Sequence, residues 1–289
     1  MNVLSLFDGM SCGQIALDKL GIKVDNYFAS EIDLHAMKVT KHNYPETIFE
    51  GDVTKVKGNK LPKIGLLFGG SPCQGFSFAG KKLNFEDPRS KLFFEFVRLI
   101  KECEPKYFLL ENVKMKKEHE KVITEHLGVE PILINSSLLT AHNRPRLYWT
   151  NIPNVEQPND KGILLKDIID LQGDNYEYIP EEKTINRQYK NNYLQYDING
   201  KRHGSQDQRA YYLDNKHGCL DTGASGKAKI LEQDGRVRKV TRNEAERLQG
   251  VPDNYTNIVS RAQALKMLGN GWTVDVIAHI FKGMSKPTE

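Results

Sequence analysis

A cysteine in a loop bounded by glycine and proline is the first feature of this sequence that could carry out chemistry. The stretch GGSPCQGFS places Cys73 just after the apolar run IGLLF, which has the character of a buried strand. Pro72 restricts one backbone angle and Gly75 frees another, so the loop can present the thiol. A thiolate near a cation or a helix N-terminus is a nucleophile. The alternative is a structural buried thiol, and the loop alone leaves both interpretations open.

Two further motifs could assist such a nucleophile. Glu111 ends the apolar run YFLLENV, where partial desolvation would raise its pKa and help it to hold a proton. A capping or ion-paired glutamate is the alternative. Arg144 and Arg146, in HNRPRLYW, lie two residues apart and would share one face of a strand. They could hold an anion or stabilise charge on a carbonyl oxygen of a base, or they could form a solvated basic turn.

Three polar features follow successive strand-like runs near the N-terminus. The loop FDGMSCG, residues 7–13, opens a helix; Glu31 ends the second run, and Asp52 follows the third. Helix N-terminal amides favour an anionic group, and a strand-end carboxylate can accept from ribose hydroxyls. Asp52 could reach an adenine amino group. Each feature alone could be a plain turn with a solvent-facing acid. Together, at one edge of a sheet, they indicate a nucleoside cofactor.

The same region argues against other nucleotide sites. The spacing of the first loop is not GxGxxG, which weakens a nicotinamide or flavin interpretation. The chain also has no GxxxxGK[ST], so nothing indicates a triphosphate or Mg²⁺.

The elements that must position these residues are strands alternating with amphipathic helices. One predicted helix is GQIALDKLG, which ends at Gly21, and another is SKLFFEFVRLIKECEP. Strand, helix and strand at this spacing predict a parallel α/β sheet. The strand-like runs are residues 3–7, 26–30, 64–70, 107–113 and 131–137.

Residues 151–239 break this pattern and predict a small irregular domain or insert. Strands are hard to assign there, and helical periodicity is weak. Between residues 181 and 239 there are 12 lysines and arginines against 8 aspartates and glutamates, so this segment carries the whole net charge of +4. We therefore predict a catalytic and cofactor-binding domain from residues 1–150 and 236–289, and a separate domain from residues 151–235.

Helical order returns at Thr241. The sequence TRNE is a capping-box pattern, in which the Thr241 hydroxyl and the Glu244 carboxylate satisfy free amides at a helix start. The helix that follows should end at Gly250. A second helical stretch, from residue 260, is broken by Gly-Asn-Gly at 269–271, which suggests a close backbone approach there.

Composition excludes several classes of protein. No apolar run approaches the roughly 20 residues that span a bilayer, and the N-terminus has no signal-peptide pattern. The four cysteines form no CxxC pair and no zinc-site spacing, so we expect a reduced cytosolic compartment and no metal. The four are Cys12, Cys73, Cys103 and Cys219.

Taken in order, these motifs resemble the cytosine-C5 DNA methyltransferases. The match covers residues 1–150 and 236–284, and its details look closest to the branch of animal de novo enzymes and small phage or bacterial relatives. The matching segments are LFDGMSCG, ASEID, GDV, GGSPCQGFS, FEDPRSKLFFEF, ENV, HNRPRLYW, TRNEAERLQGVPDNY and KMLGNGWTVDVI.

The resemblance implies a Rossmann-like methyltransferase fold, a mixed and mostly parallel sheet with helices on both faces. It implies S-adenosyl-L-methionine as cofactor and S-adenosyl-L-homocysteine as product, with no metal. By the same resemblance, Cys73 attacks C6 of a flipped cytosine and Glu111 bonds N3 and the exocyclic amine. Arg146 supports the base at O2, with Arg144 beside it.

The resemblance also implies the cofactor-binding residues. Phe7 would stack near the adenine, Glu31 would bind the ribose, and Ile32 follows it in the same motif. The methionine end would be cradled by Asp8, Gly9, Met10, Ser11 and Cys12. Asp52 and Val53 would meet the adenine, and Leu92, Asn270, Gly271 and Trp272 would close the pocket.

Three positions depart from the pattern of many relatives. Ser11 stands where many have a second glycine, and His142 stands where many have glutamine. Gly271 and Trp272 replace the more common Ser-Val. We interpret these as marks of a subfamily.

The resemblance further implies that residues 151–235 recognise the target. We expect a monomer that acts on double-stranded DNA, does not bind a membrane, and works in a bacterial or phage-host cytoplasm at the nucleoid. It would be either a restriction-modification or a phage orphan enzyme.

Three alternatives remain. A tRNA methyltransferase would carry Pro-Pro-Cys and Cys-Phe-Thr, whereas this chain has Ser71-Pro72-Cys73 and no CFT. A non-catalytic nucleic-acid-binding relative would lack the nucleophile or the cofactor loop. A nicotinamide-dependent dehydrogenase would have GxGxxG.

Overall fold

The computed structural model describes residues 1–71, 91–170, 176–197, 206–220 and 228–285. The chain divides into two compact units, which are described separately below. Unit 1 is Met1–Ile134, Pro145–Gln157 and Val276–Glu289; unit 2 is Asn135–Arg144 and Pro158–Asp275. Unit 2 contains residues 158–235 of the predicted insert as well as residues 236–275, which were predicted to belong to the catalytic domain. The functional domain assignment made from the sequence stays a prediction.

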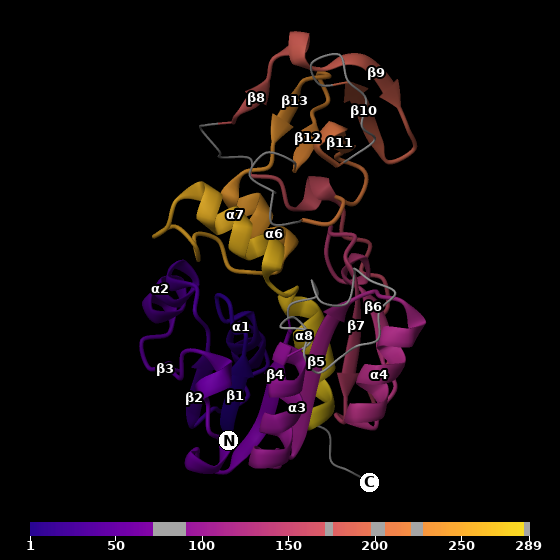
Figure 1. Ribbon diagram of the computed structural model, residues 1–289. Helices are drawn as coiled ribbons and strands as arrows, with labels where there is room; N and C mark the ends of the chain where they lie inside the picture. Colours follow the sequence, from indigo (N-terminus) through magenta and orange to yellow (C-terminus); the bar gives the residue numbers. More distant parts are fainter. Residues whose placement is uncertain (72–90, 171–175, 198–205, 221–227, 286–289) are drawn as a thin grey trace. The chain divides into compact units, whose positions relative to one another are not determined.

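A seven-stranded sheet forms the centre of unit 1, in the order β3-β2-β1-β4-β5-β7-β6 (Figure 1). β1 pairs in parallel with β2 and β4, β2 with β3, and β4 with β5, whereas β7 runs antiparallel to β5. The strands are β1 Asn2–Leu6, β2 Asn26–Ser30, β3 Ile48–Phe49, β4 Ile64–Gly69, β5 Tyr107–Val113, β6 Ile132–Asn135 and β7 Pro145–Thr150.

Helices cover both faces of this sheet because successive side chains of a strand point to opposite sides. On β4, Leu67 belongs to the core beneath Phe93 and Phe96 of α3, all three at most 1% exposed. The next residue, Phe68, packs instead against Phe281 of α8. The helices of unit 1 are α1 Cys12–Lys19, α2 Leu34–Asn43, α3 Lys91–Cys103, α4 Lys117–Leu127 and, from Val276 onward, α8 Val274–Phe281.

The predicted α/β sheet is confirmed, and all five strand-like runs form strands. The stop predicted at Gly21 is confirmed as well, because this glycine adopts a left-handed φ of 64° just after α1. Two strands, β3 and β7, are not among the five runs, although Asp52 was expected to follow a strand and the two arginines to share the face of one. β3 has only two residues, too few for a visible period, and β7 begins at a proline in a basic stretch.

A six-stranded sheet forms the centre of unit 2, in the order β8-β13-β12-β11-β10-β9. Its strands have two to five residues, and edge strand β9 is exposed on both faces, so no alternation of apolar and polar residues marks it. This is why the sequence suggested only an irregular region. The strands are β8 Tyr178–Ile179, β9 Ile185–Tyr189, β10 Tyr193–Asp197, β11 Arg209–Tyr212, β12 Lys229–Leu231 and β13 Val237–Lys239.

The two predicted helical stretches after Thr241 are confirmed. α6 is Arg242–Leu248, with the complete capping box of Thr241 and Glu244. Gly250 follows it with a left-handed φ of 69°. α7 is Arg261–Asn270, and the chain turns out of the helix at Gly271.

A buried ion pair links β13 to α6 within unit 2. Arg238 is 1% exposed and Glu244 is fully buried; Nη2 and Nη1 of the arginine lie 2.7 and 2.8 Å from the two carboxylate oxygens. Burial alone would lower the pKa of Arg238, but its bonds to Glu244 and Glu232 raise it above its ordinary value. The guanidinium also lies over the Tyr176 ring, 4.4 Å from its centroid.

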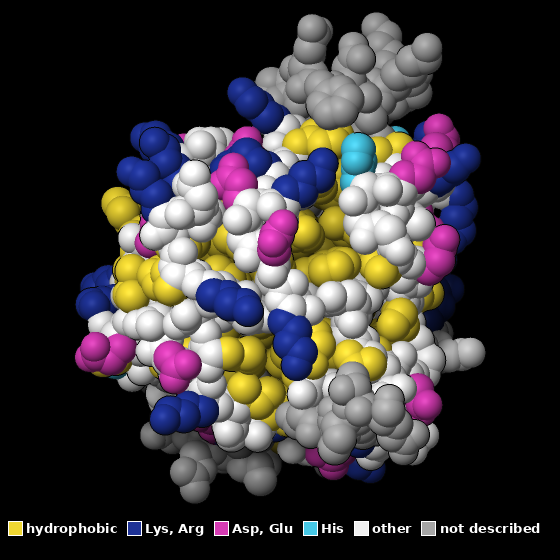
Figure 2. Space-filling model, turned by 90° about the horizontal axis from the view of Figure 1, so that it is seen from below, with side chains coloured by type: hydrophobic (Ala, Val, Ile, Leu, Met, Phe, Trp, Pro, Cys, Tyr) yellow, Lys and Arg dark blue, Asp and Glu magenta, His cyan; other side chains and the backbone are white. Residues whose placement is uncertain are grey.

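Charges of both signs are interspersed on the face of the molecule in Figure 2. Lysine and arginine side chains lie there among aspartates, glutamates and apolar side chains. The positive charge of the chain is therefore not concentrated on the described part of that face.

We predict that Glu244→Gln lowers the free energy of unfolding by about 2 kcal/mol, because it leaves the buried Arg238 with only the partly exposed Glu232 as countercharge. The amide can still accept from the Thr241 backbone, so the cap is kept. Urea unfolding measures the effect. Asp234→Asn breaks the exposed pair with Arg236 and should leave stability nearly unchanged. Equal losses in the two variants would contradict this view of the buried pair.

Candidate active site

The loop after β1 turns through three left-handed residues. The backbone φ is 56° at Phe7, 61° at Gly9 and 63° at Ser11. Glycine adopts this conformation without the steric cost that other residues pay, which explains why a second glycine is common where this chain has Ser11. A Cβ added at Gly9 would meet no atom within 4 Å. The space beside Gly9 is therefore open, as close approach of a ligand to this part of the loop requires.

Asp8 braces this loop from inside. Its Oδ1 accepts hydrogen bonds from the Ser5 hydroxyl at 2.5 Å and the Tyr27 hydroxyl at 2.7 Å, and its Oδ2 accepts from Ser11. Burial raises the pKa of Asp8 to about 6, although these hydrogen bonds oppose the rise. The side chain is thus occupied in shaping the loop and changes its charge near neutral pH.

Glu31 ties the end of β2 to the same loop. Its Oε2 accepts from the Gly9 amide at 2.8 Å, and its Oε1 accepts from the amides of Ile32 and Asp33, both at 2.7 Å. Ile32 is 73% exposed and offers an apolar surface beside the carboxylate. A carboxylate has about four lone-pair sites, so Glu31 can accept a further bond from a ribose hydroxyl.

The third strand-end feature follows β3. The Ser30 hydroxyl donates to the Gly51 carbonyl at 2.7 Å, which connects the ends of β2 and β3. Asp52 Oδ1 accepts from the amide and hydroxyl of Thr54, at 3.0 and 2.9 Å, and these bonds lower the pKa of Asp52. Val53, buried, follows it. Because β1, β2 and β3 are parallel neighbours, the three predicted features meet at one edge of the sheet.

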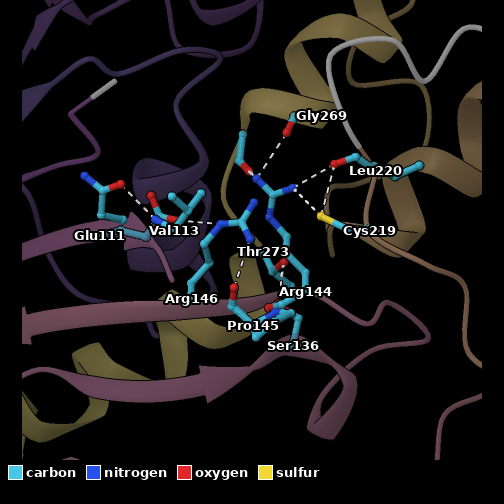
Figure 3. A network of polar contacts seen from close by, with 12 residues as sticks. Glu111, Val113, Ser136, Arg144, Pro145, Arg146, Cys219, Leu220, Gly269 and Thr273 are labelled. Atoms are coloured by element: carbon cyan, nitrogen blue, oxygen red, sulfur yellow. Dashed lines mark hydrogen bonds and ion pairs between the residues drawn. The ribbon is translucent and has the colours of Figure 1, made fainter. Parts of the chain in front are cut away.

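Glu111 and Arg146 form an ion pair on neighbouring strands. Arg146 lies opposite Val113 in the β5–β7 register, so Glu111 is its diagonal neighbour on the same face. Arg146 Nε lies 3.0 Å from Glu111 Oε1, and the side chains are 14% and 11% exposed (Figure 3). Arg146 Nη1 also donates to the Pro145 carbonyl at 2.9 Å. The structure thus brings a carboxylate and a guanidinium together, as base recognition would require.

Asn112 anchors the segment that leads to the predicted nucleophile. Its amide nitrogen lies 3.3 Å from both the carbonyl and the hydroxyl oxygen of Ser71, which is 5% exposed. Cys73 itself lies outside the described residues. Sequence reasoning missed the role of Asn112, although its position beside Glu111 in ENV is a signal. It also missed Tyr27, which an apolar strand conceals.

Arg144 has different partners from Arg146. It precedes β7, so the strand alternation expected of the two arginines applies only to Arg146. Arg144 is 3% exposed, and among the described residues its guanidinium donates to four acceptors of unit 2: Leu220 O, Cys219 Sγ, Gly269 O and Gly271 O.

The residues predicted to close the cofactor pocket lie on two elements. Leu92 is on α3 and packs against the core of unit 1. Asn270 is exposed at the end of α7, and Gly271 and Trp272, both partly exposed, follow it in unit 2. Their contact with the cofactor stays a prediction.

Comparison with known proteins decides the family. A family model described as C-5 cytosine-specific DNA methylase matches residues 1–286. The chain belongs to this family. It is a DNA (cytosine-5-)-methyltransferase, which confirms the predicted function and excludes the dehydrogenase alternative.

Similar methyltransferases match along nearly the whole chain. Type II methyltransferase M1.ScrFI of Lactococcus lactis subsp. cremoris is 33% identical over 99% of this chain and 78% of its own length. Type II methyltransferase M.NlaX of Neisseria lactamica is 31% identical over 98% of this chain and 95% of its own. The predicted methyltransferase fold is also confirmed: the solved Entamoeba histolytica methyltransferase EhMeth superposes with a TM-score of 0.74 over 99% of both chains, at 18% identity.

Within the described residues, no helix combines the length and apolar character needed to cross a bilayer.

We predict that the unfolding free energy contributed by Asp8 rises as pH falls from 8 to 5. The pKa of Asp8 is raised to about 6 in the folded chain from 3.8, so the folded state takes up a proton first. The contribution is lost as pH rises through 6, and it amounts to about 1 kcal/mol between pH 8 and pH 5. Chemical denaturation across this range measures it.

Asp8→Asn supplies the control, since the difference in stability between wild type and variant cancels other titrations. Buried His217, whose pKa burial lowers to about 4, contributes the opposite slope in both proteins. A pH-independent difference between wild type and Asp8→Asn would contradict the prediction.

Proposed function

We propose that this methyltransferase acts through Cys73 on a cytosine that Glu111 and Arg146 hold, with S-adenosylmethionine as methyl donor and double-stranded DNA as acceptor. The observation that carries the proposal is the Glu111–Arg146 pair, 3.0 Å apart beside the Asn112 anchor of the Ser71 backbone. It supports a base-binding site at Glu111, the residue of β5 that precedes Asn112.

The pair matches two neighbouring positions on a cytosine ring. A glutamate can hold a proton at N3 and accept from the exocyclic amine, while a guanidinium donates to O2. Both interactions favour build-up of negative charge in the ring as a nucleophile adds to C6. The partial burial of both side chains excludes water that would weaken them.

Cys73 would provide that nucleophile. Cytosine C5 is a poor nucleophile until C6 has been attacked, so covalent catalysis divides one difficult step into two. Loss of the C5 proton and release of Cys73 would then restore aromaticity. Because the reacting atoms lie inside a duplex, the base must first be flipped out, at a cost of a few kcal/mol.

The loop after β1 and the ends of β2 and β3 fit a nucleoside cofactor. S-adenosylmethionine, when bound, supplies an electrophilic methyl group. We propose that Glu31 accepts from the ribose, Phe7, Ile32, Asp52 and Val53 meet the adenine, and the backbone from Asp8 to Cys12 holds the methionine end. Support comes from the open space at Gly9 and the 73% exposure of Ile32. Leu92, Asn270, Gly271 and Trp272 would close the pocket.

The remaining proposals concern the DNA. Residues 151–235 would recognise the target sequence, with their lysines and arginines neutralising phosphates and making binding salt-sensitive. The chain would act as a monomer in a bacterial or phage-host cytoplasm. The basic charge of residues 181–239 supports the assignment of this region to DNA.

We predict that Cys73→Ser abolishes methyl transfer but leaves S-adenosylmethionine binding near normal. A hydroxyl is a far weaker nucleophile than a thiolate at neutral pH, and the proposed cofactor residues are unchanged. Transfer of a tritiated methyl group measures activity, and calorimetry measures cofactor binding. Glu111→Gln, which keeps the thiol, should slow transfer about 100-fold. Full turnover by Cys73→Ser on duplex DNA would refute the mechanism.

A second prediction concerns the acceptor. Incubation with tritiated S-adenosylmethionine should label duplex DNA in preference to tRNA, because the chain has Ser-Pro-Cys and lacks Cys-Phe-Thr. Both acceptors are offered in one reaction and separated before counting. Preferential labelling of tRNA would overturn the DNA assignment, and bisulfite sequencing of the labelled DNA would identify the target site.

A further inference from the structure

We infer that Arg144 is a positioning residue, which joins the segment at 219–220 to the chain turn at 269–271. This differs from a catalytic role beside Arg146. The inference rests on the proposed function, in which residues 151–235 recognise DNA and Trp272 closes the cofactor pocket.

The guanidinium of Arg144 bridges two separate stretches of backbone (Figure 3). Its Nη1 donates to the Leu220 carbonyl at 2.9 Å and lies 3.5 Å from Cys219 Sγ. Its Nη2 donates to the carbonyls of Gly269 at 3.1 Å and Gly271 at 2.9 Å. All four acceptors are uncharged, and the side chain is 3% exposed. Both terminal nitrogens of the guanidinium fork, Nη1 and Nη2, thus have acceptors within unit 2.

A second set of hydrogen bonds connects the backbone of Arg144 to the same turn. The Ser136 amide donates to the Arg144 carbonyl at 3.2 Å, and the Ser136 hydroxyl lies 2.9 Å from that of Thr273. Thr273 donates to Gln249 Oε1 at 2.8 Å, and Gln249 Nε2 donates to the Leu268 carbonyl at 2.5 Å. The side chains of Ser136, Thr273 and Gln249 are all buried. The turn around Trp272 is therefore held twice: directly by the guanidinium of Arg144, and through Ser136 by the backbone carbonyl of Arg144.

His142 holds the segment at Leu220. Its Nε2 accepts from the Leu220 amide at 2.7 Å, and the residue is fully buried. The backbone beside it pairs with His217, through the Asn143 amide to the His217 carbonyl at 2.9 Å and the His217 amide to the Ala141 carbonyl at 2.8 Å. His142 thus shares the Leu220 contact of Arg144 on the recognition side.

These contacts separate the roles of the two arginines. A base oxygen at either end of the Arg144 fork would have to displace a backbone carbonyl from a buried site. Only a planar fork with several donors can reach carbonyls in two segments at once, and lysine cannot replace it. Arg144 therefore aligns the recognition segment and the pocket-closing turn, while Arg146, paired with Glu111, is the arginine proposed to contact the base.

Steady-state and single-turnover kinetics on duplex DNA test this inference. Arg144→Lys should raise KM for S-adenosylmethionine and KM for DNA, each about ten-fold, since both segments lose an anchor. Its single-turnover rate with both substrates saturating should stay within about five-fold of wild type. Arg146→Lys should instead lower that rate by about 100-fold. If Arg144→Lys lowers the saturated rate as much with unchanged KM values, Arg144 contacts the base and the inference is overturned.

Substitutions of His142 give a second test, which does not depend on whether the Arg144 variant folds. His142→Ala should raise KM for DNA and leave KM for S-adenosylmethionine unchanged, because it releases only the segment at Leu220. His142→Gln, whose amide oxygen can accept the same bond, should restore KM for DNA. A rise in KM for S-adenosylmethionine in His142→Ala, or failure of glutamine to restore KM for DNA, would contradict the inference.

Leu194→Ala serves as the stability control. Leu194 is fully buried in the core of the small sheet, and its truncation removes stability without touching an acceptor of Arg144. An equal rise in KM for S-adenosylmethionine in Leu194→Ala would mean general destabilisation and would overturn the inference. The proposed function fails separately, if Arg146→Lys keeps the wild-type single-turnover rate.

Discussion

The carboxyl ends of the parallel strands meet at one edge of the sheet in unit 1, and the candidate site of that unit depends on this. The loop after β1, Glu31 after β2 and Asp52 after β3 are far apart in the sequence but adjacent at this edge. The antiparallel strand β7 adds Arg146 beside Glu111. No single element holds the site; its geometry follows from the order of the strands.

Polar contacts shape this edge more than apolar packing does. Glu31 uses both carboxylate oxygens to hold backbone amides, and Asp8 uses both of its own to hold hydroxyls. Such buried networks are favourable only when every member is paired, which makes the loop rigid. A loop with left-handed residues at Phe7 and Ser11 requires that rigidity, because their backbone conformation is costly.

Polar side chains also hold segments of unit 2 together, over longer distances in the sequence. Its short strands form a small apolar core that includes Leu194 and Tyr196, and two almost fully buried arginines join its segments. Arg238 is paired with Glu244 and so carries its countercharge inside, whereas Arg144 is satisfied by neutral carbonyls and a thiol. The first arrangement stabilises the packing of β13 on α6. The second connects segments whose mutual alignment matters for the proposed reaction.

The sequence by itself determined the alternation of strands and helices, the capping box at Thr241 and the strand-end positions of Glu31 and Glu111. These signals are local, since period, glycine and capping residues act within a few positions. Tertiary structure alone decided the six short strands of unit 2, the anchoring of Ser71 by Asn112 and the different partners of Arg144 and Arg146. Two arginines separated by one proline look equivalent in sequence, and only the long-range pairing of β7 with β5, which begins after Arg144, gives them separate surroundings.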